Sequence, residues 1–231
     1  MKLFIYDLET TGLEETARVV EICAYNVETG AIFYERVNPE MKIPKESSNI
    51  HEIYDKDVKD CPIFSEILPK FIEFCSKSSK KDRDACLIAH NNIGFDKRVL
   101  RAEAYRIGVV LPNWRYMDTL RIARIIYPNL SSYRLVDLVE KFDVAEGRLH
   151  CARDDVLNLH RLYMIMSKGK TKRQMYKMSK NYLQTTMPFG KYKGVSFVEI
   201  PEDYIKYMKR AFLNEPRHKD LRKGMRAAGR L

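Results

Sequence analysis

The 231-residue sequence contains no long hydrophobic run. Its longest unbroken apolar segments, Ala85–Ala89 and Leu162–Met166, have five residues each, whereas a membrane-spanning helix needs about 20. Near the start of the chain, Asp7 and Glu9 interrupt the region that would be apolar in a signal peptide. We therefore expect a cytoplasmic protein that does not enter a membrane.

Cysteine is scarce and is not arranged for metal binding or cross-linking. No two of the cysteines have the C-x-x-C spacing of a zinc site. Their odd number and wide separation also argue against a disulfide framework. We expect reduced thiols that pack as small apolar side chains at Cys23, Cys61, Cys75, Cys86 and Cys151.

Acidic residues are scarce in only one part of the chain. Residues 1–166 contain 24 Lys and Arg against 26 Asp and Glu, whereas residues 167–231 contain 17 against 5. The net charge of +10 therefore arises entirely from the second segment. Such a segment is either a solvated basic tail or an appendage that binds a polyanion such as nucleic acid.

The hydrophobic pattern predicts an α/β domain over residues 1–166. Runs rich in β-branched and aromatic residues predict strands at Lys2–Tyr6, Val19–Val27, Ala31–Val37 and Ala85–Ala89, with a hairpin turn at Glu28–Gly30. Apolar residues at helical spacing predict helices at Ile63–Cys75, Phe95–Tyr105, Thr119–Tyr127, Tyr133–Phe142 and Ala152–Met166, with Ser131 and Ser132 as N-caps of the fourth. The Lys-rich residues 167–184 predict a linker, and residues 185–231 a small second unit.

Four acidic residues occupy positions from which they can converge. Asp7 and Glu9 are two apart at the end of the first strand, so their side chains point to the same side of it. Asp96 begins a helix after a buried strand, and Asp155 lies in the first turn of a later helix, five residues after His150. Singly, each could be a solvated loop residue or a helix cap. Together they would repel unless cations such as Mg²⁺ or Mn²⁺ compensated their charge.

The letters around these residues resemble a known set of motifs. Asp7–Leu13, His90–Asp96 and His150–Asp155 resemble, in order and spacing, the three motifs of the DEDDh (DnaQ-like) 3′→5′ exonucleases. The resemblance implies a ribonuclease H-like fold with a five-stranded mixed sheet and helices on both faces. It also implies two Mg²⁺ or Mn²⁺ ions and His150 as the general base. The metal-binding carboxylates would be Asp7, Glu9, Asp96 and Asp155.

Four further residues are candidates for contact with the substrate. Thr10 and Leu13 match residues that touch the terminal nucleotide, although Leu13 could equally be a core leucine. His51 lies in a segment that borders the substrate cleft in many relatives; otherwise it would be a surface or capping residue. Asn91 is a candidate substrate ligand, but the second motif has one residue more than usual. Either a residue is inserted or Asn91–Asn92 takes the His-Asn position.

The basic C-terminal segment resembles the short module of the exonuclease X group of the family. The similarity lies in Met187–Gly194 and Pro201–Tyr204. Glycines around Lys191, Tyr192 and Lys193 predict a tight turn that offers two cations and an aromatic ring to phosphate and base. The alternative is a hairpin with solvated lysines. Gln184–Phe189 also loosely resembles a sliding-clamp peptide, which makes a clamp contact a weaker alternative.

These features predict a DNA 3′→5′ exonuclease that releases nucleoside 5′-monophosphates by two-metal hydrolysis. Its partner would be DNA with a 3′ end, single- or double-stranded. The nearest alternative is the same reaction on RNA. A polymerase proofreading subunit and a non-catalytic nucleic-acid-binding scaffold are weaker alternatives, because the basic appendage suggests an independent grip on DNA and the catalytic residues are all present.

Overall fold

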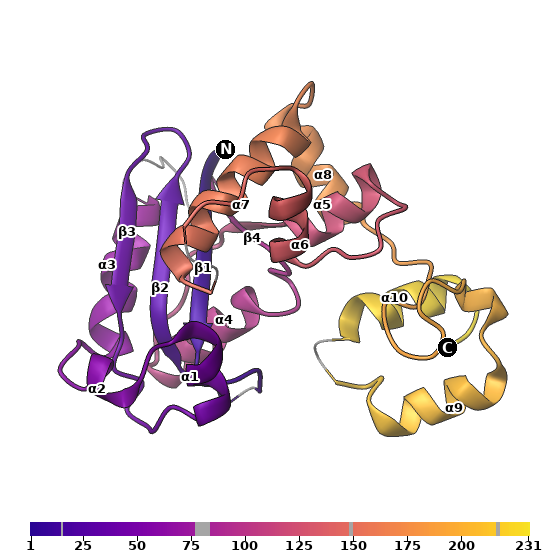
Figure 1. Cartoon of the computed structure of the whole chain (residues 1–231), viewed down its shortest axis with the longest axis horizontal. Coiled ribbons are helices and arrows are strands. Elements are labelled where there is room, and N and C mark those ends of the chain that lie inside the picture. Colours follow the sequence, from indigo (N-terminus) through magenta and orange to yellow (C-terminus); the bar gives the residue numbers. More distant parts are fainter. Residues whose placement is uncertain (15, 77–83, 148–149, 216–217) are drawn as a thin grey trace. The chain divides into compact units, whose positions relative to one another are not determined.

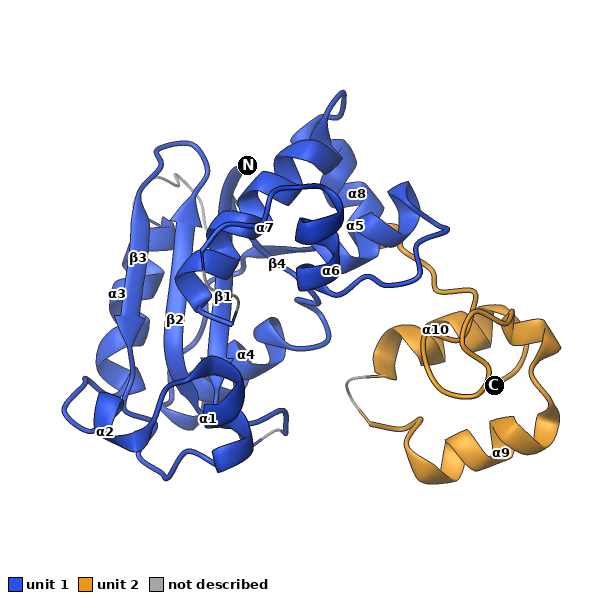
Figure 2. Ribbon diagram, in the orientation of Figure 1, with its two compact units in different colours: residues 1–180 blue, residues 181–231 orange. Residues whose placement is uncertain are grey.

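The chain forms two compact units. The structure, a computed structural model, describes residues 1–14, 16–76, 84–147, 150–215 and 218–231. Unit 1 is Met1–Lys180 and unit 2 is Asn181–Leu231 (Figure 2). Each has its own hydrophobic core. Among the described residues, no helix is long and apolar enough to cross a membrane.

A five-stranded mixed sheet forms the centre of unit 1 (Figure 1). Its strands, in the order β3-β2-β1-β4-β5, are β1 (Lys2–Thr10), β2 (Val19–Asn26), β3 (Ile32–Arg36), β4 (Ala85–Ala89) and β5 (Arg115–Asp118). β2 is antiparallel to both β1 and β3, whereas β4 is parallel to both β1 and β5. The expected α/β fold with a five-stranded mixed sheet is confirmed.

Helices cover both faces of this sheet, and the alternation of β1 explains how. Phe4, Tyr6 and Leu8 belong to a core cluster with α3 and α4, whereas Leu3 and Ile5 belong to a second cluster with α5, α6 and α7. Odd-numbered residues of β1 therefore face α7. The helices of unit 1 are α1 (Lys45–His51), α2 (Asp55–Val58), α3 (Phe64–Ser76), α4 (Asp96–Arg106), α5 (Thr119–Ile126), α6 (Leu135–Lys141), α7 (Ala152–Ser167) and α8 (Lys172–Asn181).

Helix α8 occupies much of the segment that the sequence predicted as a linker, residues 167–184. Met175 of α8 is fully buried in the second core cluster. The Ser179 hydroxyl accepts a hydrogen bond of 2.8 Å from the backbone N–H of Asp118, at the end of β5. These contacts join α8 to unit 1, so the division of the chain falls at Lys180 rather than at residue 166.

The start of α6 also differs from expectation. Ser131 and Ser132 were expected to cap this helix, but its N-cap is Arg134, which makes no side-chain cap hydrogen bond. The Ser132 hydroxyl instead donates to the side chain of Asp137. The helix therefore begins two residues later than the hydrophobic pattern suggested.

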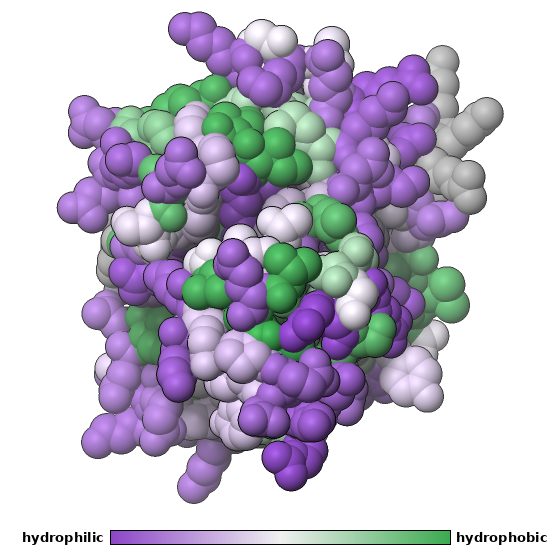
Figure 3. Space-filling view, turned by 90° about the vertical axis from the view of Figure 1, so that its right-hand side faces the viewer, coloured by the Kyte–Doolittle hydropathy of each residue, from purple (hydrophilic) through white to green (hydrophobic). Residues whose placement is uncertain are grey.

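Unit 2 is a small helical unit. A 3₁₀ turn (Phe197–Glu199) precedes α9 (Glu202–Ala211) and α10 (Lys219–Ala227), and the core includes Met187, Phe197 and Met225. Gly224 of α10 leaves no room for a side chain, because a Cβ there would lie 2.0 Å from the carbonyl oxygen of Gln184. Figure 3 shows mostly hydrophilic side chains on the surface in view, with hydrophobic residues in small groups among them.

Candidate active site

Three carboxylates meet where β1 and α7 lie together. Asp7 and Glu9 lie on the odd-numbered side of β1, the side that packs against α7. Asp155 is in the first turn of α7. One oxygen from each of these residues lies within 4.8 Å of the others. Convergence that the sequence could only suggest is therefore present in the fold.

Asp96, the first residue of α4, is a fourth carboxylate, whose charge acts on Asp7 of this group. Its side chain is only 2% exposed, and its Oδ1 atom has no hydrogen-bond partner among the described residues. Burial raises its pKa to about 8, and the charge of Asp118 adds to this, against backbone N–H groups that include that of Leu8. A buried carboxylate oxygen without a hydrogen-bond partner lowers the stability of the fold. A cation bound at this oxygen would compensate for the missing partner.

The pKa values show that the surroundings of these carboxylates disfavour their charged form. The pKa of Asp7 is raised well above its usual value, first by burial and then by the charges of Asp96, Glu9 and Asp155. The pKa of Asp155 is raised to about 7, again mainly by burial. Divalent cations with a preference for carboxylate oxygens would remove this conflict. The residues present therefore fit Mg²⁺ or Mn²⁺.

His150 lies beside this cluster in an unusual backbone conformation. Its φ is +59°, in the left-handed region, and its side chain is exposed. Its backbone N–H donates a hydrogen bond of 3.0 Å to Oδ2 of Asp155. The tight turn before α7 therefore ties the position of the imidazole to that of a candidate metal ligand.

Glu21, which the sequence analysis did not single out, supports the cluster from β2. It lies opposite Glu9 in the sheet and is 1% exposed. Its Oε2 accepts a 2.9 Å hydrogen bond from the backbone N–H of Ala152, the first residue of α7, and its Oε1 accepts one of 2.6 Å from the Tyr34 hydroxyl. Glu21 thus fixes the start of α7. The available signal was an acid within a strand that is otherwise largely apolar.

Asn92, not Asn91, is the buried asparagine of the second motif. It is fully buried, and its Oδ1 accepts a 2.7 Å hydrogen bond from the Tyr6 hydroxyl. Its Nδ2 donates to the carbonyl oxygens of Leu87 at 3.1 Å and Met117 at 2.9 Å. Asn92 therefore links β1, β4 and β5 beside Asp96.

Asn91 and His90 lie differently. Asn91 is exposed, has a φ of +64° and donates its backbone N–H to Oδ1 of Asp118 at 3.1 Å. His90 Nε2 donates to the carbonyl oxygen of Tyr133 at 2.7 Å, and its Nδ1 lies 3.0 Å from the Thr119 hydroxyl. Burial lowers the pKa of His90 to about 4. His90 therefore holds the surrounding loops, and the exposed position belongs to Asn91.

The other candidate substrate residues of unit 1 are divided between surface and interior. Leu13 is 66% exposed, which agrees with a substrate contact rather than a core leucine. Thr10 is buried, with its hydroxyl donating to the Gly12 carbonyl oxygen at 2.6 Å. His51 is 2% exposed rather than at the surface, and its Nδ1 accepts from the Ile53 N–H at 3.0 Å. Burial lowers the pKa of His51.

The candidates in unit 2 lie on a turn with glycines of positive φ, Gly190 and Gly194. Lys191 and Lys193 are exposed. The Tyr192 ring packs edge-on against Tyr204, with centroids 4.7 Å apart, so only part of this ring is accessible. In the neighbouring Gln184–Phe189 segment, Gln184 and Met187 are buried in the unit.

The comparisons with known proteins agree with the geometry of unit 1. A family model described as Exonuclease (RNase T) matches residues 4–163. A second model, named for a candidate quorum-sensing-regulated virulence factor, matches residues 174–215. The second match begins in α8 and continues through α9 of unit 2.

Two curated relatives illustrate the range of proteins that contain this domain. The DNA polymerase III subunit epsilon of Rickettsia conorii is 35% identical over 182 residues, which cover 74% of this chain and 75% of the relative. The PolC-type DNA polymerase III of Caldanaerobacter subterraneus is 34% identical over 155 residues, which cover 65% of this chain. The chain spans only about 10% of that polymerase.

Among solved structures, exonuclease X in complex with 5′ overhanging duplex DNA has a similar fold. The TM-score is 0.60 at 24% identity, and the match covers 77% of this chain and 99% of the other. The family model alone covers more than half of the chain. The resemblance read from the three sequence motifs is confirmed: the chain belongs to the RNase T (DnaQ-like) exonuclease family.

Proposed function

We propose that this protein is a 3′→5′ exonuclease that hydrolyses DNA from its 3′ end and releases nucleoside 5′-monophosphates. The observation that carries the proposal is the convergence of Asp7, Glu9 and Asp155 beside His150. Two comparisons support DNA as substrate. One relative is a subunit of DNA polymerase III, and exonuclease X was solved with duplex DNA.

Four carboxylates would hold two Mg²⁺ or Mn²⁺ ions. The raised pKa values of Asp7, Asp96 and Asp155 and the unpartnered Oδ1 of Asp96 support this assignment. When bound, the cations would offset the charge of the carboxylates and stabilise the charge that develops on the scissile phosphate. Glu21 holds α7, and with it Asp155, in position through the Ala152 N–H.

His150 is the proposed general base. It is exposed, so its imidazole is accessible to the attacking water and can take a proton from it. The hydrogen bond from its backbone N–H to Asp155 keeps His150 beside the carboxylates. The in-line attack breaks the bond between the phosphorus and the 3′ oxygen of the preceding nucleotide. The 3′ oxygen is the leaving group, and the phosphate stays on the 5′ oxygen of the released nucleoside.

The remaining candidates would hold the nucleic acid. Leu13 is exposed on the loop that follows β1 and would pack against the terminal base, with Thr10 shaping that loop. Asn91 is exposed on the loop that precedes α4 and would contact the strand. Lys191 and Lys193 would contact phosphates from unit 2. Tyr192 would contribute the accessible part of its ring.

The test uses DNA and RNA oligonucleotides of one sequence, each labelled at either the 5′ or the 3′ end, with Mg²⁺, Mn²⁺ or EDTA. Stepwise shortening of 5′-labelled DNA and immediate release of a labelled mononucleotide from 3′-labelled DNA are expected with cation. Faster hydrolysis of RNA would assign the alternative substrate. Mononucleotide release in EDTA, or from the 5′ end, would contradict the proposal.

A further inference from the structure

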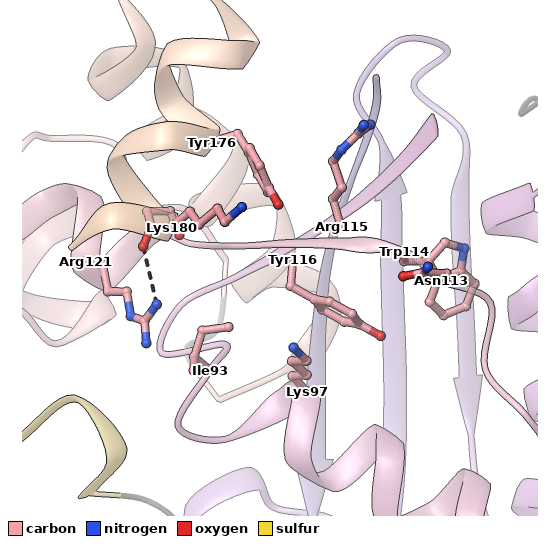
Figure 4. A pocket seen from close by; sticks show the side chains of 10 residues that line it. Ile93, Lys97, Asn113, Trp114, Arg115, Tyr116, Arg121, Tyr176 and Lys180 are labelled. Atoms are coloured by element: carbon pink, nitrogen blue, oxygen red, sulfur yellow. Dashed lines mark hydrogen bonds between the residues drawn. The ribbon is translucent and has the colours of Figure 1, made fainter. Parts of the chain in front are cut away.

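A pocket lies at the β5 edge of the sheet in unit 1, apart from the carboxylate cluster. Its volume is about 380 Å³, within the range of about 300–1,000 Å³ that is typical of small-molecule sites. Residues of α4, β5, α5 and α8 line it, and Figure 4 shows Tyr176 and Lys180 of α8 together with Arg115 and Tyr116 of β5. Because all of them belong to unit 1, the pocket does not depend on unit 2.

The lining combines positive charge with aromatic rings. Four basic side chains line the pocket, and the described residues that line it include no Asp or Glu. The Lys97 ammonium lies 4.3 Å from the centroid of the Tyr116 ring, and the Arg115 guanidinium 6.0 Å from that of Tyr176. Basic side chains and aromatic faces around one cavity suit a ligand that carries both an anionic group and an aromatic ring. The basic residues are Lys97, Arg115, Arg121 and Lys180.

Hydrogen bonds and core packing support the lining of the pocket. The Arg121 guanidinium donates to the carbonyl oxygen of Ser179 at 3.3 Å, and the Ser179 hydroxyl accepts from the Asp118 N–H at 2.8 Å. Trp114, buried directly before β5, packs edge-on against Phe71 in the core. A lining fixed in this way is largely pre-formed for a ligand.

The same loop serves both the pocket and the candidate active site. The Asp118 carboxylate accepts the backbone N–H of Ile93 at 3.0 Å, and Ile93 lines the pocket. Lys97, also in the lining, directly follows Asp96 of the carboxylate cluster. The pocket and the carboxylate cluster therefore share the loop before α4 and the first residues of that helix.

We propose that this pocket is an accessory nucleotide site: its basic residues bind a phosphate, and Tyr176 stacks on a base. The chemistry is that of a nucleotide, because cations suit phosphate and aromatic faces suit bases. The nucleotide is either part of a nucleic-acid strand or a free nucleoside monophosphate. The inference rests on the proposed function only in taking nucleic acid as the substrate.

The experiment compares the full chain with Arg115→Gln/Lys180→Gln and with Tyr176→Leu. Lys177→Gln is the matched control, because Lys177 is an exposed lysine of α8 outside the pocket lining. Binding of a fluorescent single-stranded DNA is measured in EDTA across a salt series. The double variant should bind roughly three- to tenfold more weakly, and the slope of log affinity against log salt should flatten by about 0.7 for each phosphate that is no longer neutralised.

A second arm tests the free nucleotide. Trp114, the single tryptophan of the sequence, lines the pocket, so its fluorescence reports occupancy during titration with a nucleoside 5′-monophosphate. A saturable change that the double variant loses would assign a free nucleotide. Loss of oligonucleotide affinity without such a change would assign a strand nucleotide.

The proposal is overturned if the pocket variants bind both probes as the wild type does, or if Lys177→Gln loses as much affinity as they do. Thermal unfolding checks that each variant is folded. Hydrolysis of the oligonucleotide by the wild type with Mg²⁺ is scored separately. If the wild type does not hydrolyse the oligonucleotide but binds nucleotide in the pocket, the proposed function is contradicted and the accessory nucleotide site is still supported.

Discussion

The backbone N–H of His150 donates a hydrogen bond to Oδ2 of Asp155 at 3.0 Å. This hydrogen bond joins the proposed general base to a candidate metal ligand within one turn of backbone, at a residue whose φ is +59°. The imidazole itself takes no part in it. Replacing the side chain therefore removes the base while the turn and the carboxylate remain in place.

His150→Asn should lower turnover by roughly 10²- to 10⁴-fold, the usual contribution of general-base catalysis. Asparagine tolerates the left-handed conformation at this position, and its backbone N–H still binds Asp155. Mg²⁺ affinity, measured by calorimetry, should therefore change little. Asp155→Asn is the comparison, because it should weaken both Mg²⁺ binding and turnover. An equal loss of Mg²⁺ affinity in both variants would mean that His150 has a different role.

Glu21→Ala should destabilise the protein and slow the reaction. Its removal leaves the backbone N–H of Ala152 and the Tyr34 hydroxyl without their acceptor, which costs about 1–3 kcal/mol for a buried group. Denaturant unfolding measures this loss. Because Glu21 positions α7, kcat should fall more than KM rises, and Glu21→Gln, which keeps an acceptor, should restore most of kcat. Normal kinetics in a destabilised Glu21→Ala protein would limit Glu21 to a structural role.

Replacing the two asparagines of the second motif should have different effects, one on stability and the other on KM. Asn92→Ala removes the hydrogen bonds to Tyr6, Leu87 and Met117 and should lower the free energy of unfolding by about 1–3 kcal/mol. Asn91→Gly suits the φ of +64° and should leave stability within about 0.5 kcal/mol, while raising KM if Asn91 contacts the strand. An unchanged KM would remove Asn91 from the substrate site.

The sequence predicted most of the fold because its signals are strong where elements are buried. Ala85–Ala89 was expected from a wholly apolar run and is β4 with the same bounds. β5, Arg115–Asp118, was not located, because it is only four residues long and half of them are charged. α8 was missed for a similar reason, since Met175, Tyr176 and Met178 are dispersed among lysines.

The candidate site was predictable to the extent that its residues stand in motifs. Asp7, Glu9 and Asp155 could be named from spacing, and the fold brings them together. Glu21 could not, because its importance arises from partners 13 and 131 residues away in the chain. Asn92 likewise acquires its role from three strands that meet only in the folded protein.

Stability without metal should fall as the pH rises. The folded pKa values of Asp96 and Asp155, about 8 and about 7, lie above the ordinary value of 3.8, so the folded state binds more protons between these limits. Stability is then lost from about pH 4 to about pH 8. Mg²⁺ binds the ionised carboxylates, so its stabilising effect should grow over the same range. Thermal unfolding in EDTA and in Mg²⁺ measures both trends, and a Mg²⁺ effect independent of pH would contradict them.

Truncation after Lys180 should weaken DNA binding without abolishing hydrolysis. Residues 181–231 contain 11 Lys and Arg against 5 Asp and Glu, whereas residues 167–180 contain 6 Lys and Arg and no acid. Removing unit 2 therefore deletes only half of the basic surplus, and the α8 half stays on unit 1. Affinity for long DNA should fall, and the salt slope should flatten in part, by about 0.7 for each single-strand phosphate that unit 2 had neutralised.

Hydrolysis of a short oligonucleotide at saturating concentration should survive this truncation, because all four carboxylates and His150 belong to unit 1. Truncation after Met166 is the informative comparison. It also removes Met175 from the core and the Ser179 hydroxyl from the Asp118 N–H, so it should destabilise unit 1 itself.

Gly224→Ala offers a milder test, since overpacking against the Gln184 carbonyl should destabilise unit 2 by about 1–3 kcal/mol. The exposed Arg226→Ala on the same helix serves as its stability control. If the 1–180 protein is folded and binds long DNA with an unchanged salt slope, unit 2 does not grip nucleic acid.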